Sequence, residues 1–173
     1  IRPNLEQYLN QGYTNASLML EYTSSDFAIG QFASKAIQNK KDADYFINRS
    51  QNWKNIYNPE NKWLNSKDAN GKWKDLSKDW NEATHKNYFW MVPYNLKGLI
   101  DTIGGSKIAV KRLDEFFTRL DARYEEDWFA SGNEPNFQVP WVYNWTDASY
   151  KTSEVIHRVL NEMYSSEPNG LPG

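Results

Sequence analysis

Apolar side chains recur at steps of three and four residues along most of this chain, and this spacing determines the class of fold. The clearest stretches are 17–38, 42–57 and 152–164, where the apolar positions gather on one face of an α-helix. No strand pattern competes with this interpretation outside 58–80. We expect that stretch to be a long ordered loop or a small hairpin around its Asn-Gly turn. The sequence therefore predicts an all-α fold.

Residues 1–16 contain a proline, a glycine and several asparagines, and we expect them to be an extended entry segment. We expect Ser106 to cap the helix that follows the glycine stop at 104–105. Short connections between helices make antiparallel hairpins, and a series of hairpins builds an α-solenoid or a closed α/α toroid. No repeat of fixed length is visible, which favours the toroid. Four further helical stretches are predicted: 82–91, 93–103, 106–120 and 136–145.

Composition excludes several classes of site. The chain has no Cys and two His residues, so disulfides, thiolate metal sites and all-histidine metal sites are excluded. Any metal is then expected to be a hard cation held by oxygen atoms. The net charge of -2 and the scattered Lys and Arg residues argue against nucleic acid as a partner. No apolar run approaches the roughly 20 residues of a membrane span, so no membrane partner is predicted. The compartment is left open between secreted, cell-surface and cytoplasmic.

Two glutamates stand close to aromatic residues. Glu82 lies between Trp80 and the aromatic run 88–90, and Glu134 lies in a turn ahead of Trp141. An acid beside this much apolar surface is suited to donating a proton. Glycoside hydrolysis uses two separated carboxylates, together with flat faces for sugar rings. Two alternatives stay open at this point: a helical module that binds carbohydrate without cleaving it, and a structural α-solenoid in which the aromatic residues form the core.

Seven segments of the chain form an ordered set of motifs. They are Leu20–Ile29, Arg49–Asn55 with Asn58-Pro59 after it, Asn70–Trp73, Trp90–Pro93, Gly98–Ile100, Gly132–Pro135 and Gly170–Gly173. In order and approximate spacing the set resembles glycoside hydrolase family 92, over nearly the whole chain. That family consists of calcium-dependent, inverting exo-α-mannosidases. The resemblance implies a partial (α/α)6 toroid of antiparallel helix hairpins with long loops, acting on mannose-containing glycans.

The resemblance also implies roles for individual residues. The family's general acid is a glutamate a few residues before an aromatic-rich Trp-x-Val-Pro segment, and this matches Glu82 as the catalytic residue. The family's Gly-Asn-Glu-Pro turn lines the sugar and calcium site, which makes Asn133 and Glu134 candidates for both calcium and substrate binding. Calcium prefers such amide and carboxylate oxygens. Apart from the resemblance, the aromatic faces of Trp80, Trp141 and Trp145 make these residues candidates for stacking on sugar.

The chain departs from the family pattern near these motifs. It has Lys-Asn-Tyr at 86–88 where Trp-Gln-Tyr is common, and Tyr-Asn at 94–95 where His-Asp is common. It has Phe-Gln at 137–138 where histidines are common. These changes leave the linkage open, with α-1,2-linked mannose as the candidate that the family suggests. The resemblance also implies that residues 1–173 are a single fragment of a longer catalytic domain. We therefore expect an N-terminal β-sandwich, further toroid helices and the catalytic base to lie outside this fragment, which is expected to be inactive alone.

Overall fold

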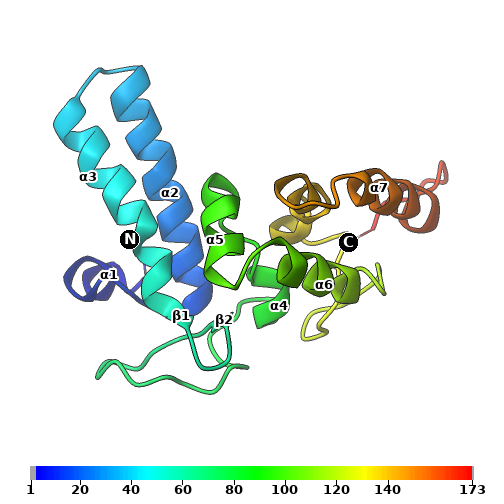
Figure 1. Ribbon diagram of the computed structural model, residues 1–173, viewed down its shortest axis with the longest axis horizontal. Coiled ribbons are helices and arrows are strands. Elements are labelled where there is room, and N and C mark those ends of the chain that lie inside the picture. The colour runs from blue at the N-terminus through cyan, green and yellow to red at the C-terminus, as the bar shows by residue number, and fades with distance from the viewer. Residues whose placement is uncertain (1–2, 173) are drawn as a thin grey trace. The chain divides into compact units, whose positions relative to one another are not determined.

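The computed structural model describes residues 3–172 and divides the chain into two compact units, Ile1–Asn81 and Glu82–Gly173. Helices dominate both units (Figure 1). Strand structure in the described residues is limited to one two-stranded ribbon and isolated bridges. The predicted all-α class is confirmed.

The first unit is built on a helical hairpin. Helix α2 (Ala16–Lys35) and helix α3 (Lys40–Ser50) run side by side in opposite directions (Figure 1). Each begins at an asparagine whose side chain accepts a backbone N–H of the first turn, Asn15 for α2 and Asn39 for α3, which is favourable capping chemistry. The helices of this unit are α1 (Leu5–Gln11), α2 (Ala16–Lys35), α3 (Lys40–Ser50) and the 3₁₀ helix η1 (Gln51–Ile56).

A buried ion pair joins the three α-helices of the first unit. The carboxylate of Asp26 in α2 is fully buried and accepts from Nε and Nη2 of Arg49 in α3 at 2.6 and 2.7 Å. The hydroxyl of Tyr8 in α1 donates to the same carboxylate at 2.5 Å. The predicted extended segment over 1–16 is therefore wrong for Leu5–Gln11, because Tyr8 anchors a helix there.

The rest of the first unit is mostly irregular. Strands β1 (Tyr57–Asn58) and β2 (Trp63–Leu64) pair antiparallel. In the loop that follows, the Asp68 carboxylate accepts the backbone N–H groups of Asn70 and Lys72 at 2.9 and 3.0 Å, so it shapes the predicted Asn-Gly turn. Of the two forms expected for 58–80, the structure shows mainly a long ordered loop: an isolated bridge between Lys67 and Trp73 flanks the Asn-Gly turn, and the two short strands pair around residues 59–62 instead.

The second unit contains four α-helices and three 3₁₀ helices in its described part. The predicted glycine stop is confirmed, since Gly104 and Gly105 adopt φ angles of 110° and 95°, which favour glycine. Two expectations are wrong: the helix predicted over 82–91 covers only His85–Tyr88, and Gly105 rather than Ser106 is the cap. The helices are α4 (His85–Tyr88), η2 (Pro93–Asn95), α5 (Leu96–Thr102), α6 (Ser106–Phe116), η3 (Glu134–Asn136), η4 (Val139–Trp145) and α7 (Tyr150–Met163).

Aromatic rings form much of the core of the second unit. The ring of Phe117 lies 5.1 Å from that of Phe129 and 6.0 Å from that of Tyr143, centroid to centroid. The Tyr143 hydroxyl donates to Asp114 at 2.9 Å. Burial, together with this hydrogen bond, raises the pKa of Tyr143. The core thus fixes η4 against α6.

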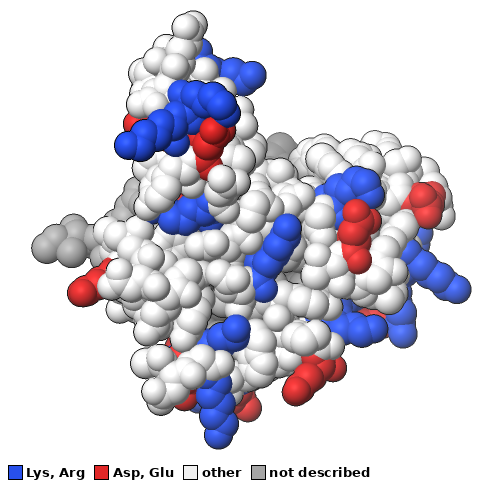
Figure 2. Space-filling model, turned by 60° about the vertical axis from the view of Figure 1, so that its left-hand side comes forward, with Lys and Arg blue, Asp and Glu red and all other residues white. Residues whose placement is uncertain are grey.

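The surface carries charges of both signs. Lys and Arg side chains are interspersed with Asp and Glu on the face shown in Figure 2. Exposed ion pairs such as Lys97 with Asp101, 2.9 Å apart, lie along single helices. None of the helices in the described part of the chain is long and apolar enough to cross a bilayer.

Candidate active site

Glu82 occupies a bend just before α4. Its backbone has a φ of 56° and its side chain is exposed. The aromatic residues expected around it turn inward instead, since Tyr88, Phe89 and Trp90 are 5, 0 and 1% exposed. The structure therefore places these rings in the core and leaves the Glu82 carboxylate at the surface.

A capping box fixes the chain immediately after Glu82. The side-chain oxygen Oδ1 of Asn87 accepts from the backbone N–H and the hydroxyl of Thr84, both at 2.8 Å. The Thr84 hydroxyl in turn accepts the backbone N–H of Lys86 at 3.2 Å. This reciprocal pattern determines where α4 begins. It holds the bend with Glu82 two residues before the cap.

The turn at 132–135 lies against the same bend. The backbone N–H of Asn133 donates to the carbonyl of Ala130 at 3.1 Å, and that of Asn136 donates to the carbonyl of Asn133 at 2.9 Å. The side chain of Asn133 then donates from Nδ2 to the backbone carbonyl of Glu82 at 3.0 Å. Glu134 follows as the first residue of η3, with an exposed side chain. The structure thus brings together Glu82 and Asn133, which are 51 residues apart in sequence.

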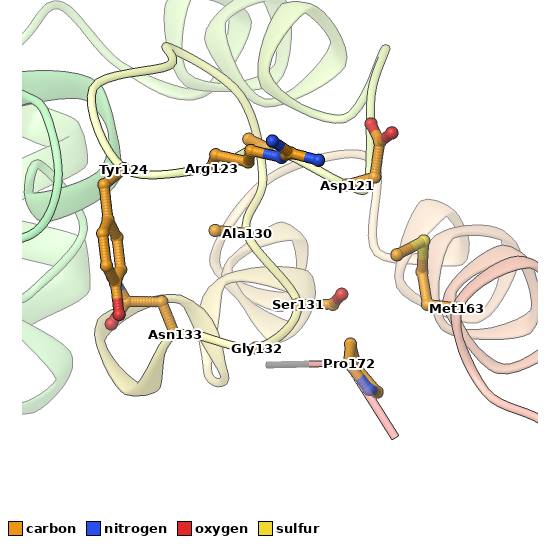
Figure 3. A pocket seen from close by; sticks show the side chains of 10 residues that line it. Asp121, Arg123, Tyr124, Ala130, Ser131, Gly132, Asn133, Met163 and Pro172 are labelled. Atoms are coloured by element: carbon orange, nitrogen blue, oxygen red, sulfur yellow. The ribbon is translucent and has the colours of Figure 1, made fainter. Parts of the chain in front are cut away.

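A cavity of about 480 Å³ opens beside Asn133. In Figure 3, Tyr124 and Asn133 lie on one side of it and Met163 lies on the other. The guanidinium group of Arg123 adds a positive charge to an otherwise mixed lining. The cavity is lined by Asp121, Ala122, Arg123, Tyr124, Ala130, Ser131, Gly132, Asn133, Met163 and Pro172.

Trp141 belongs to a second, apolar groove of about 340 Å³ between η4 and α7. Its side chain is 48% exposed, and Phe137 and Leu160 flank it with similar exposure. Ser131 lines both the cavity and the groove. Trp141 is therefore not among the residues that line the cavity beside Asn133. Trp80 lies in the first unit, half-buried, with its Nε1 donating to the carbonyl of Leu76 at 2.7 Å, and its stacking on sugar stays a prediction.

Two titratable groups flank the start of α4. Burial lowers the pKa of His85, opposed by the charge of Asp127 and assisted by those of Lys86 and Arg112. Burial alone raises the pKa of Asp127, but hydrogen bonds from Lys86 and Thr84 outweigh it, so the pKa lies below its usual range. Lys86 and Asp127 form an ion pair at 3.0 Å. At neutral pH His85 is therefore a neutral imidazole and Asp127 is a carboxylate, and both lie close to the bend.

The candidate site offers few oxygen atoms for binding a metal ion. Within residues 3–172 no cluster of three or more His, Asp or Glu side chains is arranged to hold a metal ion. The turn offers the amide oxygen of Asn133 and the carboxylate of Glu134, which are oxygen donors of the kind that calcium prefers. These two match calcium in kind, but most of the roughly six to eight oxygens it takes have to come from elsewhere.

Sequence reasoning missed the residues that hold this site in place. In the sequence Asn87 stands out only as a departure from a motif, although Thr84 and Asn87 at a spacing of three are a helix-cap signal. Asn136, fully buried behind the turn, had no signal in the sequence. Arg123 and Tyr124 lie in a loop whose path the sequence did not predict.

A family profile, a curated relative and solved structures are similar to this chain. The profile of the glycosyl hydrolase family 92 catalytic domain matches residues 2–173. The chain is 22% identical over 198 residues to an uncharacterized secreted glycosidase of Arthroderma benhamiae, with 96% of this chain and 24% of that protein covered.

Two solved structures from Bacteroides thetaiotaomicron are similar along almost the whole chain. One is the family GH92 α-mannosidase BT3965 in complex with mannoimidazole, with a TM-score of 0.85, 28% identity and coverage of 98% of this chain and 26% of that one. The other is the family GH92 inverting mannosidase BT2199, with a TM-score of 0.87, 25% identity and coverage of 99% and 27%. The chain thus spans about a quarter of the length of these relatives.

Proposed function

This chain belongs to the catalytic domain of glycosyl hydrolase family 92, and from that we propose that it is part of an inverting exo-α-mannosidase acting on mannose-containing glycans. Two of the similar solved structures are an α-mannosidase and an inverting mannosidase. Because the chain spans about a quarter of those proteins, the activity is proposed for a longer protein that contains residues 1–173 as one fragment of an α/α toroid.

One observation carries the proposal: the hydrogen bond of 3.0 Å from Asn133 to the backbone carbonyl of Glu82. It supports a shared site for the candidate acid and the candidate sugar-binding turn. Glu82 is proposed to protonate the oxygen of the leaving group, which its exposed carboxyl group is free to approach. Asn133, Glu134, Trp80 and Trp141 are proposed as substrate-binding residues.

An inverting mechanism also needs a base that activates water on the opposite face of the sugar, with the two carboxyl groups roughly 6.5–9.5 Å apart. As the resemblance implies, this base is expected outside the 173 residues. Calcium is proposed to bind Asn133 and Glu134, with further oxygens from outside this chain and from the sugar. When bound, it would hold mannose hydroxyls and favour distortion of the ring.

A second candidate function is a helical carbohydrate-binding module without catalysis. The observation that favours it is the apolar groove of about 340 Å³ with the half-exposed ring of Trp141, because exposed aromatic rings present flat faces to sugars. In that case sugar binding depends on Trp141 and is indifferent to Glu82.

The test uses two α-mannosides and the full-length protein. Glu82→Gln is expected to lower kcat on a methyl α-mannoside or a mannobiose by about 10²–10⁴-fold. It is expected to change kcat little on 2,4-dinitrophenyl α-mannoside, because dinitrophenolate leaves without a proton. The matched control is Glu125→Gln, since Glu125 is also exposed with a positive φ, 70°, and lines neither the cavity nor the groove. Full activity of Glu82→Gln on both substrates would contradict the assignment of the acid.

A further inference from the structure

A buried amide group links α4 to the loop that precedes the turn. Asn87 is 2% exposed. Its Oδ1 is held by Thr84, as the capping box requires, and its Nδ2 donates to the backbone carbonyl of Trp128 at 2.6 Å. The same Nδ2 lies 3.4 Å from Oδ1 of Asn136. One side chain therefore satisfies the start of the helix and the end of the loop together.

Asn136 makes the second half of this link. It is fully buried, and its Oδ1 accepts the backbone N–H of Ala130 at 3.0 Å as well as the contact from Asn87. Its Nδ2 has no hydrogen-bond partner among the described residues. A buried, half-satisfied amide is costly compared with an apolar side chain of similar size. Its position is better explained by the groups that it hydrogen-bonds, the backbone of Ala130 and the side chain of Asn87, than by a contribution to core stability.

Backbone and hydrogen bonds together form a closed ring that passes through Glu82. The chain runs from Glu82 to Thr84, crosses through Asn87 to Asn136, and continues through the turn to Asn133. Asn133 returns to the carbonyl of Glu82. The candidate acid is thus held on both sides, from the helix cap and from the turn.

We propose that the buried Asn87–Asn136 pair positions Glu82 for proton donation, an inference that rests on the function proposed above. Glu82 precedes the helix and adopts a φ of 56°, a left-handed conformation that costs a non-glycine residue energy unless its surroundings hold it. The ion pair between Lys86 and Asp127 also links α4 to the loop, but its side chains are 39 and 38% exposed. Exposed pairs contribute little, so the buried amides provide the firmer link.

The side chain of Asn87 uses both ends of its amide group in this link, Oδ1 toward Thr84 and Nδ2 toward the carbonyl of Trp128. An amide at this position keeps both a donor and an acceptor, so the ring depends on the amide group. Asn87 and Asn136 act as positioning residues, because they reach the reaction only through Glu82.

The experiment measures kcat of the full-length protein on methyl α-mannoside and on 2,4-dinitrophenyl α-mannoside. Asn87→Ala is expected to lower kcat on the methyl glycoside by about 10²-fold, as a small misplacement of a catalytic group does, and to change kcat little on the dinitrophenyl glycoside. Thr84→Val keeps the shape of a half-buried side chain. It removes the hydroxyl's hydrogen bonds with Asn87, Lys86 and Asp127 and keeps the bond from the backbone N–H to Asn87. It is expected to change the ratio of the two kcat values in the same direction.

Tyr143→Phe is the control for stability. It removes a part-buried hydrogen bond, to Asp114, in the same unit but outside the ring. It is expected to lower the unfolding temperature and leave the ratio of kcat values unchanged. The positioning role is overturned if Asn87→Ala and Thr84→Val both leave the ratio of kcat values unchanged while Glu82→Gln loses activity selectively on the methyl glycoside. That outcome leaves the proposed function intact. If Asn87→Ala does not fold, the ratio measured for Thr84→Val decides. No selective loss in Glu82→Gln would overturn both.

Discussion

Substitution of Asp26 by Asn is expected to destabilise the first unit strongly. The Asp26 carboxylate is fully buried and accepts three hydrogen bonds, two from Arg49 and one from Tyr8. Asparagine keeps the shape of the side chain but removes the negative charge, and it turns an NH₂ group or a weaker acceptor toward the guanidinium. The positive charge of Arg49, with its side chain 14% exposed, then has no counter-charge at this position.

The size of the effect follows from burial. Removing one partner of a buried ion pair costs about 3–5 kcal/mol. Arg49 also lies over the rings of Tyr45 and Phe46, 4.9 Å from each centroid, which offsets part of the loss, so we expect the lower end of that range, about 3 kcal/mol. Tyr8→Phe removes a single hydrogen bond to the same charge, worth about 1.5–3 kcal/mol. Asp26→Asn is therefore expected to lower the free energy of unfolding more than Tyr8→Phe does.

Urea unfolding of the 173-residue chain, followed by tryptophan fluorescence, measures both variants. Trp53 is fully buried in the first unit and reports on it. The control is Asp44→Asn, because the ion pair between Lys40 and Asp44 has side chains 86 and 58% exposed, and we expect no measurable change. A loss below about 0.5 kcal/mol for Asp26→Asn, within the range of an ordinary surface substitution, or a smaller loss than that of Tyr8→Phe, would refute the reasoning.

Three further results are expected. Gly30→Ala places a Cβ 2.8 Å from Cγ1 of Ile47 and 3.0 Å from its backbone nitrogen, so overpacking is expected to cost about 1–3 kcal/mol in thermal unfolding. His85 has a lowered pKa, mainly through burial, so the unfolded chain binds the proton more readily. The stability that this residue contributes is complete above its ordinary value of 6.5 and is lost as the pH falls through the folded-state pKa. The loss between pH about 7.5 and about 5.5 is expected to be smaller in His85→Gln, as urea midpoints at both pH values will show. The 173-residue chain alone is expected to release no mannose from α-mannosides, with or without calcium, and release measured by sugar chromatography contradicts the expected position of the base.

The long helices were predictable because apolar residues recur along them at steps of three and four. Helix α2 was expected over 17–38 and is found over Ala16–Lys35, and α7 was expected over 152–164 and is found over Tyr150–Met163. The helix expected over 82–91 fails for the opposite reason. Its residues 87–90 are all buried, and a helix that packs on one side buries only part of each turn. The chain leaves the helix after Tyr88 so that consecutive side chains face the core.

Only those residues of the site that belong to a family motif could be predicted from the sequence. The resemblance singled out Glu82 and Asn133, but their hydrogen bond joins a side chain to a backbone carbonyl, which residue types alone do not report. Asn136 is a polar residue at a buried position, and only its partners distinguish it from a loop asparagine. Motif membership also did not separate chemistry from folding, because Asp26 and Arg49 belong to quoted motifs and form a buried ion pair.

The exposure of Glu82 separates two requirements of a general acid. Its position is fixed within the second unit, by the bond from Asn133 and by the capping box of Asn87. Its carboxyl group is exposed, whereas proton transfer to a leaving group is more effective once substrate has displaced water. Enclosure is therefore expected from the bound sugar and from parts of the protein beyond this unit. A loss of enclosure lowers kcat on both α-mannosides, because it disturbs sugar binding as well. A loss of position lowers kcat selectively on the methyl α-mannoside, whose leaving group is poor and needs a proton. This difference makes the ratio of the two kcat values the decisive measurement for Asn87.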